Sequence, residues 1–131
     1  MKYNSLIERL AEKYPLKQRR FGCLPVSESL ALLVLTGFYG HSVSIAQTRQ
    51  TCRGGAIGET NHYVTIVREP SGKLVAMDAT RSSYEDSKDC WIFEAESEKE
   101  LMTQLSNHYG GKWNILDKWL HEVPEWYKGF P

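Results

Sequence analysis

The sequence predicts an α+β fold in which N-terminal helices pack on a small antiparallel sheet. Three observations carry this prediction: a long apolar helix pattern at 27–39, two strand patterns on either side of a turn signal at 62–78, and a helix-capping pattern at Ser97. Helices followed by antiparallel strands are typical of α+β chains. With 131 residues and 15.0 kDa, the chain is expected to form one domain, 1–131.

The first element is a short amphipathic helix expected at 5–14. Leu6 and Leu10, with Ile7 beside them, share one face of it, and Pro15 ends the pattern. Such a helix covers a core with one face and leaves the other to solvent.

The second element is the strongest helix pattern in the chain, at 27–39. It is apolar almost all round, which predicts a central, buried position. Its cap is either Ser27 or a residue ahead of a first turn that begins near Pro25. Gly40 ends it.

The strands come next. We expect a strand at 42–47, a glycine-rich surface loop at 48–60, and strands at 62–68 and 74–78. The last two strands form a hairpin, because the turn residues Pro-Ser-Gly at 70–72 lie between them.

The length of this turn sets the geometry of the predicted site. In a three-residue turn Glu69 faces Lys73, Asp78 faces Val64, and His62 becomes a diagonal neighbour of Asp78 on one face, within about 7–8 Å. A two-residue turn would put His62 and Asp78 on opposite faces.

The C-terminal third begins with a short strand at 91–94. A helix follows from the cap at Ser97 to about Asn107, and glycines 110 and 111 break it. The remainder, 112–131, is expected to lie against the body as a short helix and an ordered tail. It holds three tryptophans, Trp113, Trp119 and Trp126, which clamp the tail to the core or form an interface.

Composition excludes several classes of protein. Sixteen basic and sixteen acidic residues cancel, so no net charge attracts nucleic acid or anionic membrane. No apolar run approaches the roughly 20 residues of a membrane span, and the N-terminus lacks a signal-peptide core. Three unevenly spaced cysteines argue against a disulfide framework and a zinc site. We expect a cytoplasmic protein without a metal or cofactor; the sequence does not indicate its oligomeric state.

Three side chains suited to nucleophilic catalysis follow one another along the chain. Cys23 lies just ahead of the central helix, His62 opens one strand and Asp78 ends the next. A helix start, with Arg19 and Arg20 nearby, favours the thiolate form of a cysteine. A carboxylate keeps an imidazole in the tautomer and orientation of a general base. The pattern therefore predicts a Cys-His-Asp triad; the alternative is a buried filler cysteine and a structural histidine.

Gln18 is a fourth candidate, because a glutamine amide shortly before the nucleophile can donate to an oxyanion. Taken alone, a glutamine in this basic connector is a surface residue. Cys52, in the glycine-rich loop, is the reserve nucleophile, and Cys90 is incidental. The other histidines are interpreted as structural or solvated.

These residues resemble the papain-like cysteine peptidases, and most of all the bacteriocin-processing peptidases that cut leader peptides after a double glycine. The stretch LALLVLTGFYGHSVSI at 30–45 is similar to that family's nucleophile helix and its tyrosine-glycine-histidine stop. NHYVTIV at 61–67 is similar to its histidine strand, and LVAMDAT at 74–80 to its aspartate strand. The resemblance covers roughly 18–81. The transglutaminase-like peptidases share the order of the three residues and are nearly as similar.

The resemblance implies a papain-like fold with Cys23 as nucleophile, His62 as base and acid, Asp78 as its orienter and Gln18 as oxyanion donor. The activity would be that of a thiol hydrolase or acyltransferase on a peptide or side-chain amide: a peptidase, amidase or deamidase. A gap-free alignment of the helices puts the family's cysteine at Ser27, so Cys23 fits only if the helix begins one turn earlier. The family's proline after the aspartate is Ala79 here. The alternative is a catalytically inactive papain-like module that binds a protein or peptide partner.

Overall fold

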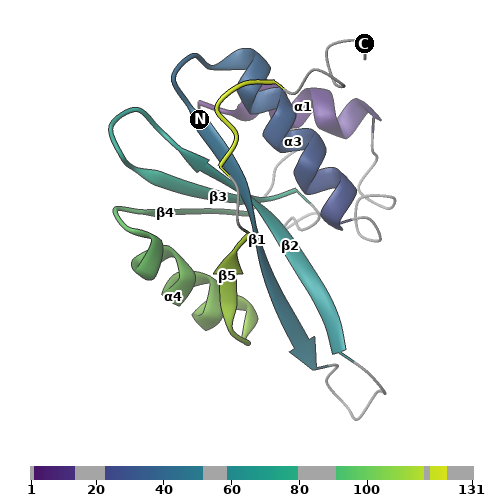
Figure 1. Cartoon of the computed structure of the whole chain (residues 1–131). Helices are drawn as coiled ribbons and strands as arrows, with labels where there is room; N and C mark the ends of the chain where they lie inside the picture. The colour runs from purple at the N-terminus through teal and green to yellow at the C-terminus, as the bar shows by residue number, and fades with distance from the viewer. Residues whose placement is uncertain (1, 14–22, 52–58, 80–90, 117–118, 124–131) are drawn as a thin grey trace.

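A computed structural model describes residues 2–13, 23–51, 59–79, 91–116 and 119–123, which form three helices and one antiparallel sheet of five strands. The elements are α1 (Asn4–Lys13), α3 (Cys23–Gly37), β1 (Ser42–Thr51), β2 (Glu59–Arg68), β3 (Leu74–Asp78), β4 (Trp91–Ala95), α4 (Glu98–Tyr109) and β5 (Trp113–Ile115). The strand order is β4-β3-β2-β1-β5 (Figure 1). The prediction of an α+β fold with an antiparallel sheet is confirmed. Gln18, Cys52, Cys90 and the side chain of Cys23 lie outside the described residues.

The sheet carries helices on both faces, and the alternation of side chains along β2 and β3 separates two cores. Val67 and Val75 pack with α1 and α3, whereas their neighbours Ile66 and Ala76 pack with α4. Figure 1 shows α1 and α3 together at one end of the molecule and α4 beside β5 at the other. Within the described part of the chain, no helix combines the length and apolar character needed to cross a bilayer.

The central helix α3 is buried as its composition predicts: Leu30 and Val34 are fully buried on the α1 side of the sheet. It begins at Cys23, one turn earlier than a start capped by Ser27. Pro25 permits this start, because a proline in the first turn forfeits no intrahelical hydrogen bond. Ser27 does not cap the helix; it is buried, and its Oγ donates to the carbonyl of Tyr63 at 3.2 Å.

The β2–β3 hairpin has the predicted three-residue turn. Glu69 N donates to Lys73 O at 2.9 Å, and Gly72 N donates to Glu69 O at 2.8 Å. Gly72 has φ 95°, a left-handed conformation that glycine adopts without steric cost. The ladder pairs Thr65 with Met77, which is the register that puts Asp78 opposite Val64.

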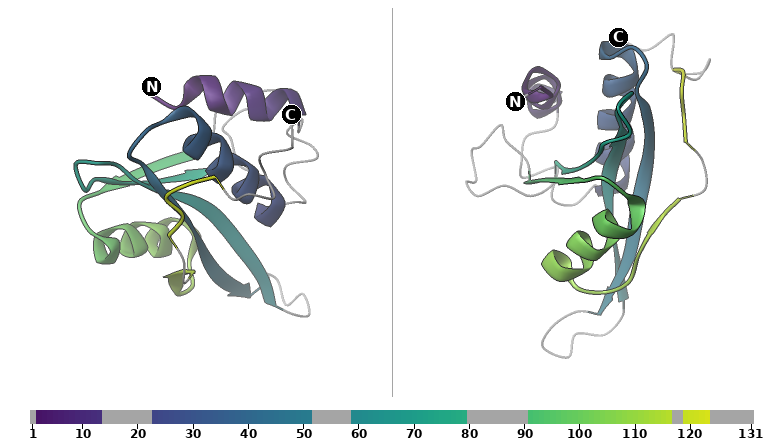
Figure 2. Two further views of the ribbon diagram at one scale, coloured as in Figure 1. Left: turned by 45° about the horizontal axis from the view of Figure 1, so that its top comes forward. Right: turned by 90° about the vertical axis from the view of Figure 1, so that its left-hand side faces the viewer.

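Two sequence expectations about the sheet are wrong. The loop expected at 48–60 is shorter, because β1 runs to Thr51 and β2 begins at Glu59. The residues at these strand ends are mostly polar, so they show no alternation of apolar and polar residues from which a strand could be predicted. The short helix expected within 112–131 is absent from the described residues there: Trp113–Ile115 is strand β5 on β1, and Leu120 bridges Val43. As Figure 2 shows, β1 and β2 project beyond the other strands at one end.

Helix α4 begins at the predicted cap and ends later than expected. Glu100 N donates to Ser97 Oγ at 3.2 Å, as in a capping box. The helix continues to Tyr109, and Gly110, with φ 83°, ends it. This extra half-turn brings Tyr109 over β2 and β3, where it joins the predicted site.

Candidate functional site

His62 and Asp78 form a buried hydrogen-bonded pair. His62 Nε2 lies 2.9 Å from Asp78 Oδ2, and the side chains are 9% and 0% exposed. The pair arises from the hairpin register, because Asp78 faces Val64 and is therefore diagonal to His62 on one face of the sheet. A buried carboxylate requires hydrogen-bond donors, and the imidazole supplies one. The predicted contact between these two residues is confirmed.

Tyr109 provides a second donor to the same carboxylate. Its hydroxyl lies 2.5 Å from Asp78 Oδ2, and its ring centroid lies 5.0 Å from that of His62. Sequence reasoning missed this residue. The available signal was helical spacing: Leu101 and Leu105 are the buried residues of α4, and Tyr109 follows at the same interval.

With Asp78 ionised, these contacts favour one tautomer of the histidine. An ionised carboxylate only accepts hydrogen bonds, so both the Tyr109 hydroxyl and His62 Nε2 donate to Asp78. In the neutral ring the proton then resides on Nε2, and Nδ1 carries the lone pair. This is the form in which an imidazole takes a proton from a nucleophile.

Aromatic side chains surround the pair. The Trp113 ring meets the His62 ring edge-on at 5.9 Å, and the Trp113 and Tyr109 rings lie 5.3 Å apart. Thr48, which faces His62 across β1 and β2, is buried and donates to the carbonyl of Lys112 at 2.6 Å. These neighbours restrict the imidazole to a narrow range of orientations.

Cys23 reaches the same level of the sheet from the helix above it. Thr65 Oγ1 donates to Ser27 O at 2.8 Å, which fixes α3 along β2. Helix α3 and strand β2 run in the same direction (Figures 1 and 2). Cys23 lies one helical turn before Ser27, about 6 Å along the axis, which equals about two residues of strand. The first residue of α3 is therefore level with the part of β2 that carries His62.

The helix and the histidine are nevertheless on different faces. Val64 and Ile66, the next residues on the face of His62, pack with α4, whereas Thr65 contacts α3. The described ladder between β2 and β3 begins at Thr65. Any contact between Cys23 and the imidazole must therefore pass around this edge of β2.

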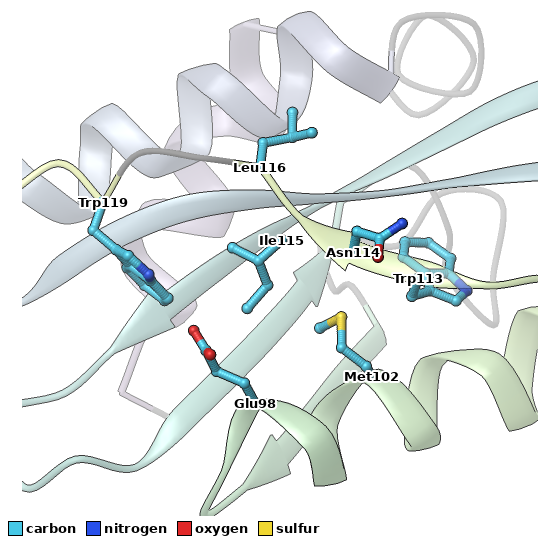
Figure 3. Close-up of a pocket in the computed structure, with 7 residues that line it drawn as sticks. All are labelled: Glu98, Met102, Trp113, Asn114, Ile115, Leu116 and Trp119. Atoms are coloured by element: carbon cyan, nitrogen blue, oxygen red, sulfur yellow. The ribbon is translucent and has the colours of Figure 1, made fainter.

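A pocket of about 310 Å³ opens on the α4 face of the sheet, between α4 and β5. Its lining comes from α4, β5 and the segment that follows: Glu98, Met102, Trp113, Asn114, Ile115, Leu116 and Trp119. Figure 3 shows Glu98, Met102, Ile115 and Trp119 directed toward a common space. Trp113 lines this pocket, and its ring also contacts the ring of His62.

Among the described residues, no group of three or more histidine, cysteine, aspartate or glutamate side chains is placed to hold a metal ion. Comparisons with protein-family models, curated proteins and solved structures find no match for this chain.

Proposed function

We propose that the protein is a thiol hydrolase or acyltransferase with a papain-like arrangement of Cys23, His62 and Asp78. The observation that carries the proposal is the buried hydrogen bond of 2.9 Å between His62 and Asp78 at the level where α3 begins. A helix start offers free amides and a positive dipole, which favour a thiolate there. Helix α3 begins at Cys23, and this is the helix start that a nucleophilic role of Cys23 requires.

The proposed reaction begins with transfer of the Cys23 thiol proton to His62 Nδ1. The thiolate attacks an amide carbonyl, and its own backbone N–H together with the Gln18 amide stabilises the oxyanion. His62 then gives the proton to the leaving amine, and water or another amine resolves the acyl-enzyme. Asp78 stays ionised and stabilises the imidazolium throughout.

The proposed substrate is a peptide or a side-chain amide. The pocket beside Trp113 supports a peptide, because Met102, Ile115 and two tryptophan rings can enclose an apolar side chain. Hydrolysis, deamidation and transfer to an amine use the same groups, and the substrate decides among them.

Alkylation of the cysteines tests the proposal. The protein is treated with iodoacetamide between pH 5 and 9, and mass spectrometry identifies the labelled residue. We expect Cys23 to react rapidly below pH 7 and His62→Ala to abolish this reactivity. His121→Ala removes an exposed imidazole elsewhere and is the matched control. An ordinary thiol profile near pH 8.5 at Cys23 would refute the proposed enzyme.

A second candidate is a papain-like module that binds a protein or peptide without catalysis. The observation that favours it is the placement of His62 and Asp78 on the face opposite α3, with side chains 9% and 0% exposed. In that case His62 has a structural role only, as a hydrogen-bond donor to the buried Asp78 carboxylate. Equal alkylation of Cys23 in the wild type and in His62→Ala supports this candidate.

A further inference from the structure

We propose that Tyr109 is a positioning residue that fixes Asp78 and thereby tunes the basicity of His62. A role of Tyr109 in catalysis rests on the proposed function, whereas its effect on the protonation of His62 does not depend on it. The hydroxyl of Tyr109 and Nε2 of His62 lie 2.5 and 2.9 Å from one carboxylate oxygen, Asp78 Oδ2. The three groups come from α4, β3 and β2, so the arrangement depends on the tertiary fold.

The sharing of one oxygen has an electrostatic consequence. A carboxylate that accepts a hydrogen bond from a phenol disperses part of its charge onto that bond, and it then attracts a neighbouring imidazolium less strongly. Tyr109 therefore holds His62 closer to the neutral form that a general base requires. Without the hydroxyl, the full charge of Asp78 acts on the ring.

Tyr109 is itself held firmly enough to act in this way. Its ring lies 5.3 Å from Trp113, 5.8 Å from Phe93 and 4.7 Å from His108, measured between ring centroids. Ring contacts of this kind each favour one side-chain orientation. Thus the hydroxyl is aimed at the carboxylate before any substrate binds.

The described titratable groups around the His62 ring are few. Asp78 projects from β3, and Tyr109 with its neighbour His108 projects from α4. From β1 and β5 the ring meets Thr48 and Trp113, neither of which titrates. The Tyr109 hydroxyl and the His62 ring share Asp78 Oδ2, so loss of the hydroxyl acts on the ring through this carboxylate.

NMR titration of the histidine ring signals tests the inference, with the His62 signal assigned by its loss in His62→Gln. We expect Tyr109→Phe to raise the midpoint of the His62 titration by about half to one pH unit. The shift follows from the net free energy of one hydrogen bond, because each pH unit corresponds to a tenfold change in the protonation equilibrium. Tyr3→Phe is the matched control, because Tyr3 is a buried tyrosine that donates to a different carboxylate, Glu69, at 2.6 Å. We expect it to leave the midpoint unchanged.

An unchanged midpoint in folded Tyr109→Phe overturns the inference. The wild type supplies a readout that needs no variant: a hydroxyl proton bound to a buried carboxylate gives a far-downfield signal with a nuclear Overhauser contact to the His62 ring. Absence of that contact also overturns it. If the midpoint rises while Cys23 alkylates as an ordinary thiol, the positioning role stands and the proposed enzyme falls.

Discussion

Removal of the Asp78 carboxylate is expected to destabilise the protein strongly, and more than its conversion to an amide. The side chain is 0% exposed, and it accepts hydrogen bonds from His62 and Tyr109. Asp78→Ala leaves both donors unpaired in a buried site, at about 1–3 kcal/mol each. Removal of the buried charge also removes the free-energy cost of its desolvation, which offsets part of this loss. The expected net decrease in the free energy of unfolding is about 3 kcal/mol.

Asp78→Asn separates the hydrogen bonds from the charge. The amide retains a carbonyl oxygen that accepts from one or both donors, so the expected decrease is about 1–2 kcal/mol. Urea unfolding at pH 7, followed by tryptophan fluorescence, measures both variants. Glu94→Ala removes an exposed carboxylate from the adjacent strand, where it forms a surface ion pair of 3.2 Å with Lys73. It is the control, with an expected decrease below about 1 kcal/mol. Asp78→Ala as stable as the wild type, or Asp78→Asn as unstable as Asp78→Ala, would refute this reasoning.

Two further predictions concern contacts that hold the helices to the sheet. Burial raises the pKa of Glu69, but hydrogen bonds from Tyr3 and Lys2 to the carboxylate lower it further. The pKa of Glu69 therefore lies below its ordinary value. A lowered folded-state pKa stabilises the protein above the unfolded value of about 4.5, and this stabilisation is lost as the pH falls through the folded value. Tyr3→Phe should therefore lower the free energy of unfolding by about 1.5–3 kcal/mol at pH 7 and by clearly less at pH 3. Urea unfolding at both pH values measures the difference. An equal loss at both pH values would contradict a hydrogen bond from Tyr3 to ionised Glu69. Thr65→Val removes the hydroxyl that donates to Ser27 O. It should lower the free energy of unfolding by about 1 kcal/mol in the same assay and slow the alkylation of Cys23. Wild-type behaviour in both measurements would show that this contact does not position α3.

The sequence allowed prediction of those features that local chemistry determines. The three residues Pro70 to Gly72 define the turn, and the turn defines the register that brings His62 to Asp78. Ser97 marks the start of α4 because its hydroxyl accepts from Glu100 N. In each case the cause lies within a few residues of its effect.

The missed features depend on distant partners. β5 has three residues and exists through its pairing with β1, so Trp113 to Ile115 carry no strand pattern of their own. Tyr109 joins Asp78 only because α4 packs across the hairpin. The start of α3 was ambiguous for another reason, because both Ser27 and the turn at Pro25 are acceptable helix starts. The structure has the earlier start, with Ser27 inside the helix and its hydroxyl bound to Tyr63 O.

The most direct measurement is the separation of Cys23 Sγ from His62 Nδ1 in a crystal structure of the reduced protein. The proposed enzyme requires about 3.5–4 Å between these atoms, with the sulfur reaching the imidazole around the edge of β2. A sulfur buried against α1, or held beyond about 8 Å from the ring by the intervening strand, would contradict the account.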